Sequence, residues 1–131
     1  MIKSEWRFWI IIKTIDVHLN KDAEFFIQDL SDDFISVSGG EIDKPDKEDV
    51  RNMFRNYFNT TQFSEYHDLQ EPIIGFSNDG SLAWSIIQVK VAGMQVTGGL
   101  ERDLDFTAAW ITLYERQEEK WVRIAEVSNF K

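Results

Sequence analysis

The chain has 131 residues, of which 43% are hydrophobic and 14% aromatic, and its formal net charge is -9. This length and composition are typical of one folded domain spanning residues 1–131 and exclude a disordered chain. The negative charge argues against a nucleic acid partner, because phosphates would be repelled. The absence of cysteine excludes disulfides, a thiolate zinc site and a cysteine nucleophile.

The first predicted element is a helix over residues 4–19. Its apolar side chains recur at helical spacing, at Phe8, Ile11, Ile12, Ile15 and Leu19. A strand is the alternative, because Ile10–Ile12 is a β-branched run. The stretch contains charged residues, lacks a following signal-peptide cleavage site and is too short to cross a bilayer. We therefore expect a cytoplasmic protein with no membrane partner.

A second helix is expected after Asn20, whose side chain can accept hydrogen bonds from the first-turn amides. Its inward side chains would be Ala23, Phe26, Ile27 and Leu30. A turn at Ser31–Asp33 then leads into a short strand at Phe34–Val37, which ends at two glycines.

A third helix is predicted to begin after Pro45, with Asp46 as its cap. Its apolar residues follow the i, i+3, i+4, i+7, i+8 rule, at Val50, Met53, Phe54, Tyr57 and Phe58. This is the clearest helical pattern in the chain.

From Tyr66 onward the hydrophobic period becomes that of strands. We place four of them near residues 66–76, 81–96, 102–116 and 120–130. Asn78–Gly80, Gly98–Gly99 and Gln117–Lys120 supply the turns. Helices followed by an antiparallel meander indicate an α+β domain.

The long strands are apolar on both faces. Leu82, Trp84 and Ile86 share one face of their strand, whereas Ala83 and Ile87 share the other. Such a sheet needs cover on both faces, and the helices supply only one. We therefore expect a homodimer formed through the second sheet face.

Several short motifs carry a resemblance to a known superfamily. They are Asp22, Asp32–Phe34, Asp79–Trp84, Tyr114–Arg116, Lys120–Trp121 and Ser128. With the order of elements, they resemble the nuclear transport factor 2-like superfamily, in its SnoaL-like branch. The resemblance implies three N-terminal helices packed on a strongly curved antiparallel sheet, the cone-shaped, cystatin-like α+β fold. It also implies a deep, mostly apolar pocket.

The best-known chemistry of the superfamily is not matched. The proton-abstracting aspartate and the oxyanion tyrosine of ketosteroid isomerases would fall near Ser38 and Thr14, and neither side chain suits the task. Association-domain relatives place an arginine and histidines at stretches that correspond here to Thr107–Trp110 and Arg123–Val127, which contain no histidine.

Two residues remain as catalytic candidates. Glu126 lies in the middle of the last strand, where burial would raise its pKa; it could instead pair with Arg116 or Arg123. His18 could face the pocket as a base or lie on the helix surface.

Other ionisable residues have simpler roles open to them. His67 and Asp68 point to opposite strand faces, and Asp32–Asp33 suits a solvated turn. Asp103 and Asp105 share a strand face and could form a pair or meet solvent. No spacing typical of a metal site occurs, so we expect no metal and no cofactor.

The residues expected to line a ligand pocket are Trp6, Phe54, Phe58, Trp84, Trp110 and Ser128. Core packing or dimer burial is the alternative for the tryptophans. The sequence thus favours a homodimeric binding or accessory protein with a pocket for a small apolar molecule. An isomerase, cyclase or hydrolase acting on a small apolar substrate is one alternative, and an association domain with a filled cavity is another.

Overall fold

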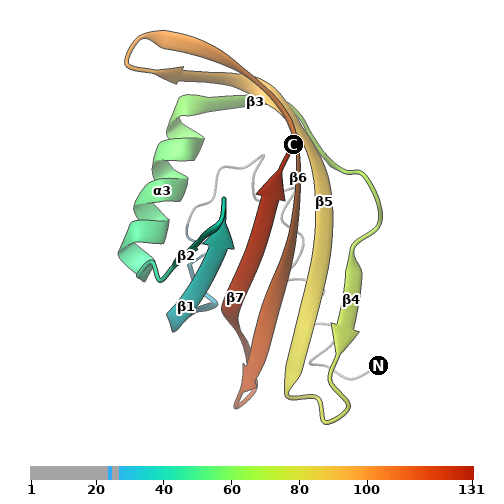
Figure 1. The fold of residues 1–131 in the computed structure, drawn as a ribbon. Coiled ribbons are helices and arrows are strands. Elements are labelled where there is room, and N and C mark those ends of the chain that lie inside the picture. Colours follow the sequence, from blue (N-terminus) through green and yellow to red (C-terminus); the bar gives the residue numbers. More distant parts are fainter. Residues whose placement is uncertain (1–23, 25–26) are drawn as a thin grey trace.

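The computed structural model describes Glu24 and residues 27–131. Within this part the chain has α+β architecture, with one helix lying beside a curved sheet of seven strands (Figure 1). The elements are β1 (Leu30–Ser38), β2 (Glu41–Asp43), α3 (Lys47–Thr60), β3 (Thr61–Asp68), β4 (Ile73–Phe76), β5 (Leu82–Thr97), β6 (Leu100–Gln117) and β7 (Lys120–Phe130).

Of the three predicted helices, the third is confirmed as α3. The helix over residues 4–19 lies outside the described residues, as does most of the second helix. At the described end of the second helix, Ile27–Asp29 forms a turn and Leu30 begins β1. The prediction that Leu30 belongs to a helix is therefore wrong. Leu30 is nevertheless buried, as predicted, in a cluster with Ile27 and Phe34.

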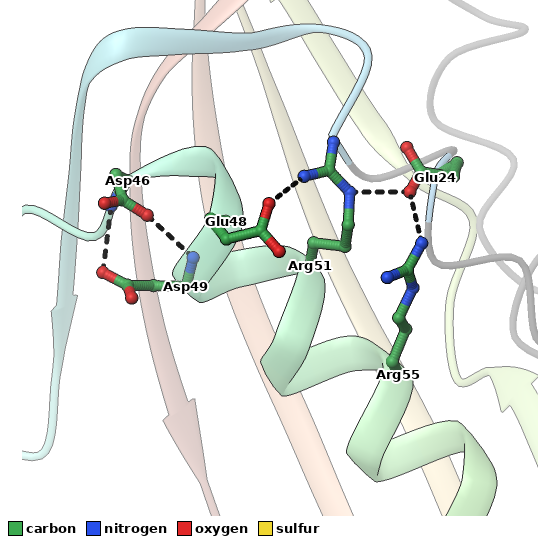
Figure 2. A network of polar contacts seen from close by, with 6 residues as sticks. All are labelled: Glu24, Asp46, Glu48, Asp49, Arg51 and Arg55. Carbon is green, nitrogen blue, oxygen red and sulfur yellow. Dashed lines mark hydrogen bonds and ion pairs between the residues drawn. The ribbon is translucent and has the colours of Figure 1, made fainter.

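Helix α3 begins at a reciprocal cap. The Asp46 carboxylate accepts a hydrogen bond from the Asp49 amide at 2.8 Å, and the Asp49 carboxylate accepts one from the Asp46 amide at 3.4 Å (Figure 2). Arg51 then bonds Glu24 at 2.7 Å, which ties the chain before β1 to the helix (Figure 2). Val50 and Phe58 face inward, as their spacing predicts.

The strand order is β2-β1-β7-β6-β5-β3. Strand β4 pairs with the edge of β5 that also holds β3, but at the other end of β5. The predicted single strand at 66–76 is wrong, because β3 and β4 are separate strands with Pro72 between them. The other three long strands are confirmed to within a few residues.

The short first strand departs from the prediction in two ways. It is parallel to β7, whereas an antiparallel sheet was expected throughout. It also starts before the predicted turn, and a shift of register between Leu30 and Ile35 absorbs Ser31–Asp33 as an irregular stretch of β1. The exposed side chains of Asp32 and Asp33 belong to this stretch.

The sheet bends toward α3, so that the β5–β6 hairpin reaches over the end of the helix (Figure 1). The Gln95 side chain donates to the Thr60 hydroxyl at 3.3 Å across this contact. We call the face turned toward α3 the concave face and the opposite one the convex face. Side chains alternate between them as predicted: Ala83, Ile87 and Val89 are buried on the concave face, whereas Ile86 is exposed on the convex face.

Candidate functional site

A bulge in β7 brings two charged side chains to the concave face. Leu113 of β6 pairs with Ala125, but the next residue, Tyr114, pairs with Arg123, so Ile124 is one residue extra. Without the bulge, Arg123 and Glu126 would point to opposite faces, because they are three residues apart. With it, both lie on the face that also carries Tyr114.

Arg123 is tied to the turn before β1. Its backbone amide donates to the Asp29 carbonyl at 2.7 Å, and its Nη2 lies 3.2 Å from Asp29 Oδ1. Both side chains are only 9% exposed. A charge this deeply buried needs a partner, and Asp29 supplies it.

Glu126 lies on the other side of the same guanidinium. Its Oε2 is 4.0 Å from Arg123 Nη1 and accepts a hydrogen bond from the Thr112 hydroxyl at 3.2 Å. The Glu126 side chain retains 28% exposure. The carboxylate is thus bordered by protein, although part of the Glu126 side chain remains exposed.

Glu126 and Thr112 belong to a row of polar side chains that crosses the concave face. Strand register aligns Ser85 of β5, Thr112 of β6, Glu126 of β7 and Ser36 of β1. Among the described residues, no hydrogen-bond partner is found for the buried Ser85 hydroxyl or for Arg123 Nε. Buried polar atoms are normally satisfied, so both atoms are exceptions within the described part of the chain.

We call Asp29, Thr112, Tyr114, Arg123 and Glu126 the concave-face cluster. Burial has the largest single effect on the pKa of each of its ionisable groups. It raises the pKa of Glu126 even though Arg123 and the Thr112 hydrogen bond act against the rise. It raises the pKa of Asp29 in the same way, and that of Tyr114 to about 12. Burial opposes the charge of Arg123, but Tyr114, Asp29 and Glu126 together raise its pKa, so the guanidinium stays charged.

A groove of about 690 Å³ borders the cluster at the end of the sheet. Asp29 lines it, beside Trp121 and the exposed side chains of Asp32 and Lys47. Most of the residues that line it are polar, which differs from the mostly apolar pocket that the resemblance implies. The groove gives solvent a path to the Asp29 side of the cluster.

The residues expected to line one pocket do not lie together. Phe54 and Phe58 belong to α3 and pack in the clusters on its inward side. Trp84 lies on the convex face of the sheet, over Gly75. Trp110 and Ser128 are paired on the concave face, in the row next to Thr112 and Glu126. Because Trp84 and Trp110 lie on opposite faces, one pocket does not contain both. Trp6 lies outside the described residues.

The remaining candidates from the sequence are scattered. His18 and Thr14 lie outside the described residues. His67 bonds Glu65 at 2.6 Å on the convex face, and this bond raises the pKa of the imidazole. Asp105 pairs with Lys90 on that face. No group of three or more metal-ligating side chains is found in the described part of the chain.

The sequence predicts Glu126 as a candidate and Arg123 as its possible partner, and the structure places the two side chains together. The sequence does not point to Asp29, which falls in the predicted second helix, or to Thr112, which resembles any other β-branched strand residue. The available signal was a charged residue, Arg123, in an otherwise apolar stretch of the last strand. The bulge that turns it toward Glu126 has no mark in the sequence.

Comparisons with solved structures agree on the fold, whereas two other comparisons find no match. No protein-family model matches the sequence, and the curated proteins give no match either. Among solved structures, an NTF2-like protein from Cytophaga hutchinsonii is 17% identical, with a TM-score of 0.69 and 98% of both chains covered.

Two further structures extend the agreement. A candidate calcium/calmodulin-dependent kinase II association domain from Exiguobacterium sibiricum is 14% identical, with a TM-score of 0.72, covering 100% of this chain and 95% of that one. An NTF2-like protein with a cystatin-like fold from Novosphingobium aromaticivorans is 12% identical, with a TM-score of 0.65, covering 97% and 81%. The protein therefore has the nuclear transport factor 2-like fold.

Proposed function

We propose that the protein is a small-molecule-binding or accessory protein whose ligand lies on the concave face. The observation that carries the proposal is the buried Arg123, whose Nε has no hydrogen-bond partner within the described residues. The Ser85 hydroxyl, separated from Glu126 by strand β6 in the same row, also has no hydrogen-bond partner among the described residues, and the Glu126 side chain is 28% exposed. Polar groups arranged this way inside an apolar surface are typical of ligand sites.

The surroundings of the cluster favour a ligand with an apolar part. Trp110 is half-buried and pairs across the sheet with Ile87 and Ser128. Its indole offers a large apolar surface next to the polar row, and aromatic side chains make such contacts at little entropic cost. A ligand would place its polar group near Glu126 and its hydrocarbon part near Trp110.

Amide NMR spectra of the isotopically labelled protein, recorded with a library of small uncharged compounds, test this proposal. We expect at least one compound to shift the amide signals of Thr112, Glu126 and Ser128. Trp110→Ala should weaken that compound's binding, whereas Ile86→Ala, on the convex face, should leave it unchanged. A library without any binder, or shifts confined to other surfaces, would contradict the proposal.

A second candidate function is an enzyme, and the environment of Glu126 favours it. A glutamate whose pKa is raised by burial, and whose side chain is partly exposed, suits a general base or acid. The reaction would be an isomerisation, cyclisation or hydrolysis of a small apolar substrate. Replacing Glu126 by Gln should then reduce turnover by about 100-fold or more while leaving substrate binding in place.

The convex face favours a homodimer, which is the second part of the proposal. Two apolar rows cross this face in register. One row is Ile73, Ile86, Ile111, Val127 and Val37, and the other is Trp84, Leu113, Ala125 and Ile35. In the first row, Ile111 is 40% and Val127 45% exposed. A patch of this kind is typical of an interface, and a second copy would cover it isologously.

The location of the protein stays a prediction. No helix within residues 27–131 combines the length and hydrophobicity that a membrane crossing requires. A cytoplasmic location is proposed from the sequence alone. A protein that forms dimers but binds no small molecule would instead support the association-domain alternative.

A further inference from the structure

The two apolar rows of the convex face differ in how far their side chains stand out from the sheet. Those of the first row are 37–47% exposed on four neighbouring strands, at Ile73, Ile86, Ile111 and Val127. We call this row the ridge. It runs across the strands in register, so its exposed side chains form one continuous line.

The second row is lower, and we call it the trough. It consists of Gly75, Trp84, Leu113 and Ala125. Gly75 has no side chain, and Ala125 has only a methyl group. The Trp84 indole occupies the place of a Gly75 side chain, because a β-carbon at Gly75 would collide with the ring. The indole therefore lies along the sheet, and the trough stays shallow beside the ridge.

Ridge and trough fit each other under one two-fold rotation. Two sheets in aligned packing keep their strands within about 30° of each other, so the strands of two copies run either antiparallel or parallel. An axis that crosses the strands at the level of Ser85 and Thr112, between the two rows, makes them antiparallel and places each ridge over the trough of the other copy.

The parallel arrangement packs less well. An axis along the strands would place ridge against ridge and leave both troughs unfilled. Protein interfaces pack as densely as protein interiors, which favours the antiparallel arrangement. Because both complementary rows lie on the same face of one chain, the partner that fits them is a second copy of this chain.

The polar residues beside the two rows agree with this orientation. Beyond the ridge, Ala109 lies between Gln88 and Asn129, and beyond the trough lies Glu115, on the same strand as Ala109. The antiparallel arrangement places the Glu115 carboxylate of one copy over Ala109 of the other, between two amides that can donate hydrogen bonds. The parallel arrangement would place both Glu115 side chains at one level, where their charges repel each other.

We propose that two copies of the chain pack convex face to convex face with antiparallel strands, the ridge of each copy lying in the trough of the other. The inference rests on the homodimer proposed above and adds to it the orientation of the partner. In this dimer the concave faces point away from each other, and the two β5–β6 hairpins lie at opposite ends.

Spin labels test the orientation, and the absence of cysteine lets each label be placed alone. Gln117→Cys and Thr97→Cys carry labels at exposed, opposite ends of the long hairpin. Measured along the strands, these sites lie about 17 Å and about 40 Å from the Ser85–Thr112 level. The distances between labels in the dimer of the full chain are measured by double electron–electron resonance.

In the antiparallel dimer we expect two Gln117 labels about 35 Å apart. In dimers mixed from the two variants, the Thr97 label should lie closer to the label at the partner's Gln117 than two Thr97 labels lie to each other. Parallel strands would bring the two Gln117 labels within about 20 Å and would overturn the inference.

Filling the trough tests the contact itself. Ala125→Leu places a larger side chain where the partner's ridge would lie, so we expect dimerisation to weaken at least about tenfold in sedimentation velocity. Ala92→Leu is the matched control, because it makes the same change at a half-buried position of the same face, beyond the ridge. It should dimerise like the wild type. Thermal unfolding followed by circular dichroism verifies that both variants are folded.

The outcomes separate the two proposals. A dimer with parallel strands, or a folded Ala125→Leu variant that dimerises normally, overturns the inference and leaves the homodimer standing. A wild-type chain that is monomeric at micromolar concentration overturns the homodimer, and the proposed orientation fails with it.

Discussion

Arg123 is the residue on which the order of the concave face depends. It connects the turn before β1 to the middle of the sheet through both its backbone and its guanidinium. The side chain also separates two carboxylates that would otherwise face one another across a poorly hydrated space. Such a residue contributes to stability and to the chemistry of the site at once.

The first prediction concerns this buried pair. Replacing Arg123 by Met leaves Asp29 buried without its cation, and we expect a loss of about 3–5 kcal/mol in the free energy of unfolding. The double variant with Asp29→Leu removes the stranded charge and should recover much of that loss. Urea denaturation measures both. A single variant as stable as the wild type would contradict the assigned pairing.

The second prediction concerns the turn between β4 and β5. Asp79 Oδ1 accepts hydrogen bonds from the Ser77 and Ser81 hydroxyls and from the Ser81 amide, at 2.7–3.0 Å. The Ser81 side chain contributes most to the fall in the pKa of Asp79, from 3.8 to about 2. Because the folded state lowers this pKa, its stabilisation is complete above the unfolded value and disappears as the pH falls through the folded one.

Asp79→Asn should therefore lower the melting temperature at pH 7, and the difference from the wild type should narrow between about pH 4 and about pH 2. Thermal unfolding followed by circular dichroism over this range provides the measurement. Asp103→Asn, also exposed, serves as the control. A difference that stays constant with pH would mean that the charge of Asp79 does not stabilise the turn.

Among the elements, α3 shows how local sequence and tertiary packing cooperate. Its cap fixes where the helix begins, and its apolar stripe fixes which side faces the sheet. Arg51, which is partly buried, and Arg55, which is exposed, both bind Glu24 and so attach the preceding chain to the helix (Figure 2). The cap and the apolar stripe are local signals, which is why the start of this helix was predicted correctly.

The third prediction tests that cap. Asp46→Ala removes the acceptor for the Asp49 amide and should lower the free energy of unfolding by about 1 kcal/mol. Asp46→Asn retains an acceptor and should cost much less. Urea denaturation compares the two. Equal losses in both variants would show that the charge of Asp46, rather than its hydrogen bond, stabilises the start of the helix.

The sequence was informative where structure depends on near neighbours, and failed where it depends on distant pairing. The alternation of residues 82–91 between two faces was predicted correctly, because the period of a strand is local. The start of β1 at Leu30, its parallel pairing with β7 and the bulge at Ile124 depend on strands far apart in the chain. The bulge brings the side chains of Arg123 and Glu126 to the same face of the sheet, so the candidate site could be predicted from the sequence only in part.

At the scale of the whole molecule, the two sheet faces have different chemistry. The concave face carries the polar row between apolar neighbours, and the convex face carries two apolar rows at the same level of the strands. Thr112 and Ile111 are neighbours in β6, yet one belongs to the candidate site and the other to the candidate interface. Dimer formation through the convex face would not involve the side chains of the polar row.

The fourth prediction follows from this division. Ile111 lies in the middle of its row, between Ile86 and Val127, and is 40% exposed. A lysine at this position would place a charge where a second copy packs, and desolvating that charge is costly. We expect Ile111→Lys to weaken dimerisation by about 100-fold or more, as measured by sedimentation velocity across a range of concentrations.

Thr97→Lys provides the matched control, because it adds the same charge at an exposed position of β5 next to the hairpin turn. It should dimerise like the wild type. Ligand shifts at Thr112 and Glu126 should survive in the Ile111→Lys monomer, since the site lies on the other face. A wild-type protein that sediments as a monomer at micromolar concentration would contradict the dimer. An Ile111→Lys variant that dimerises normally would move the interface away from this row.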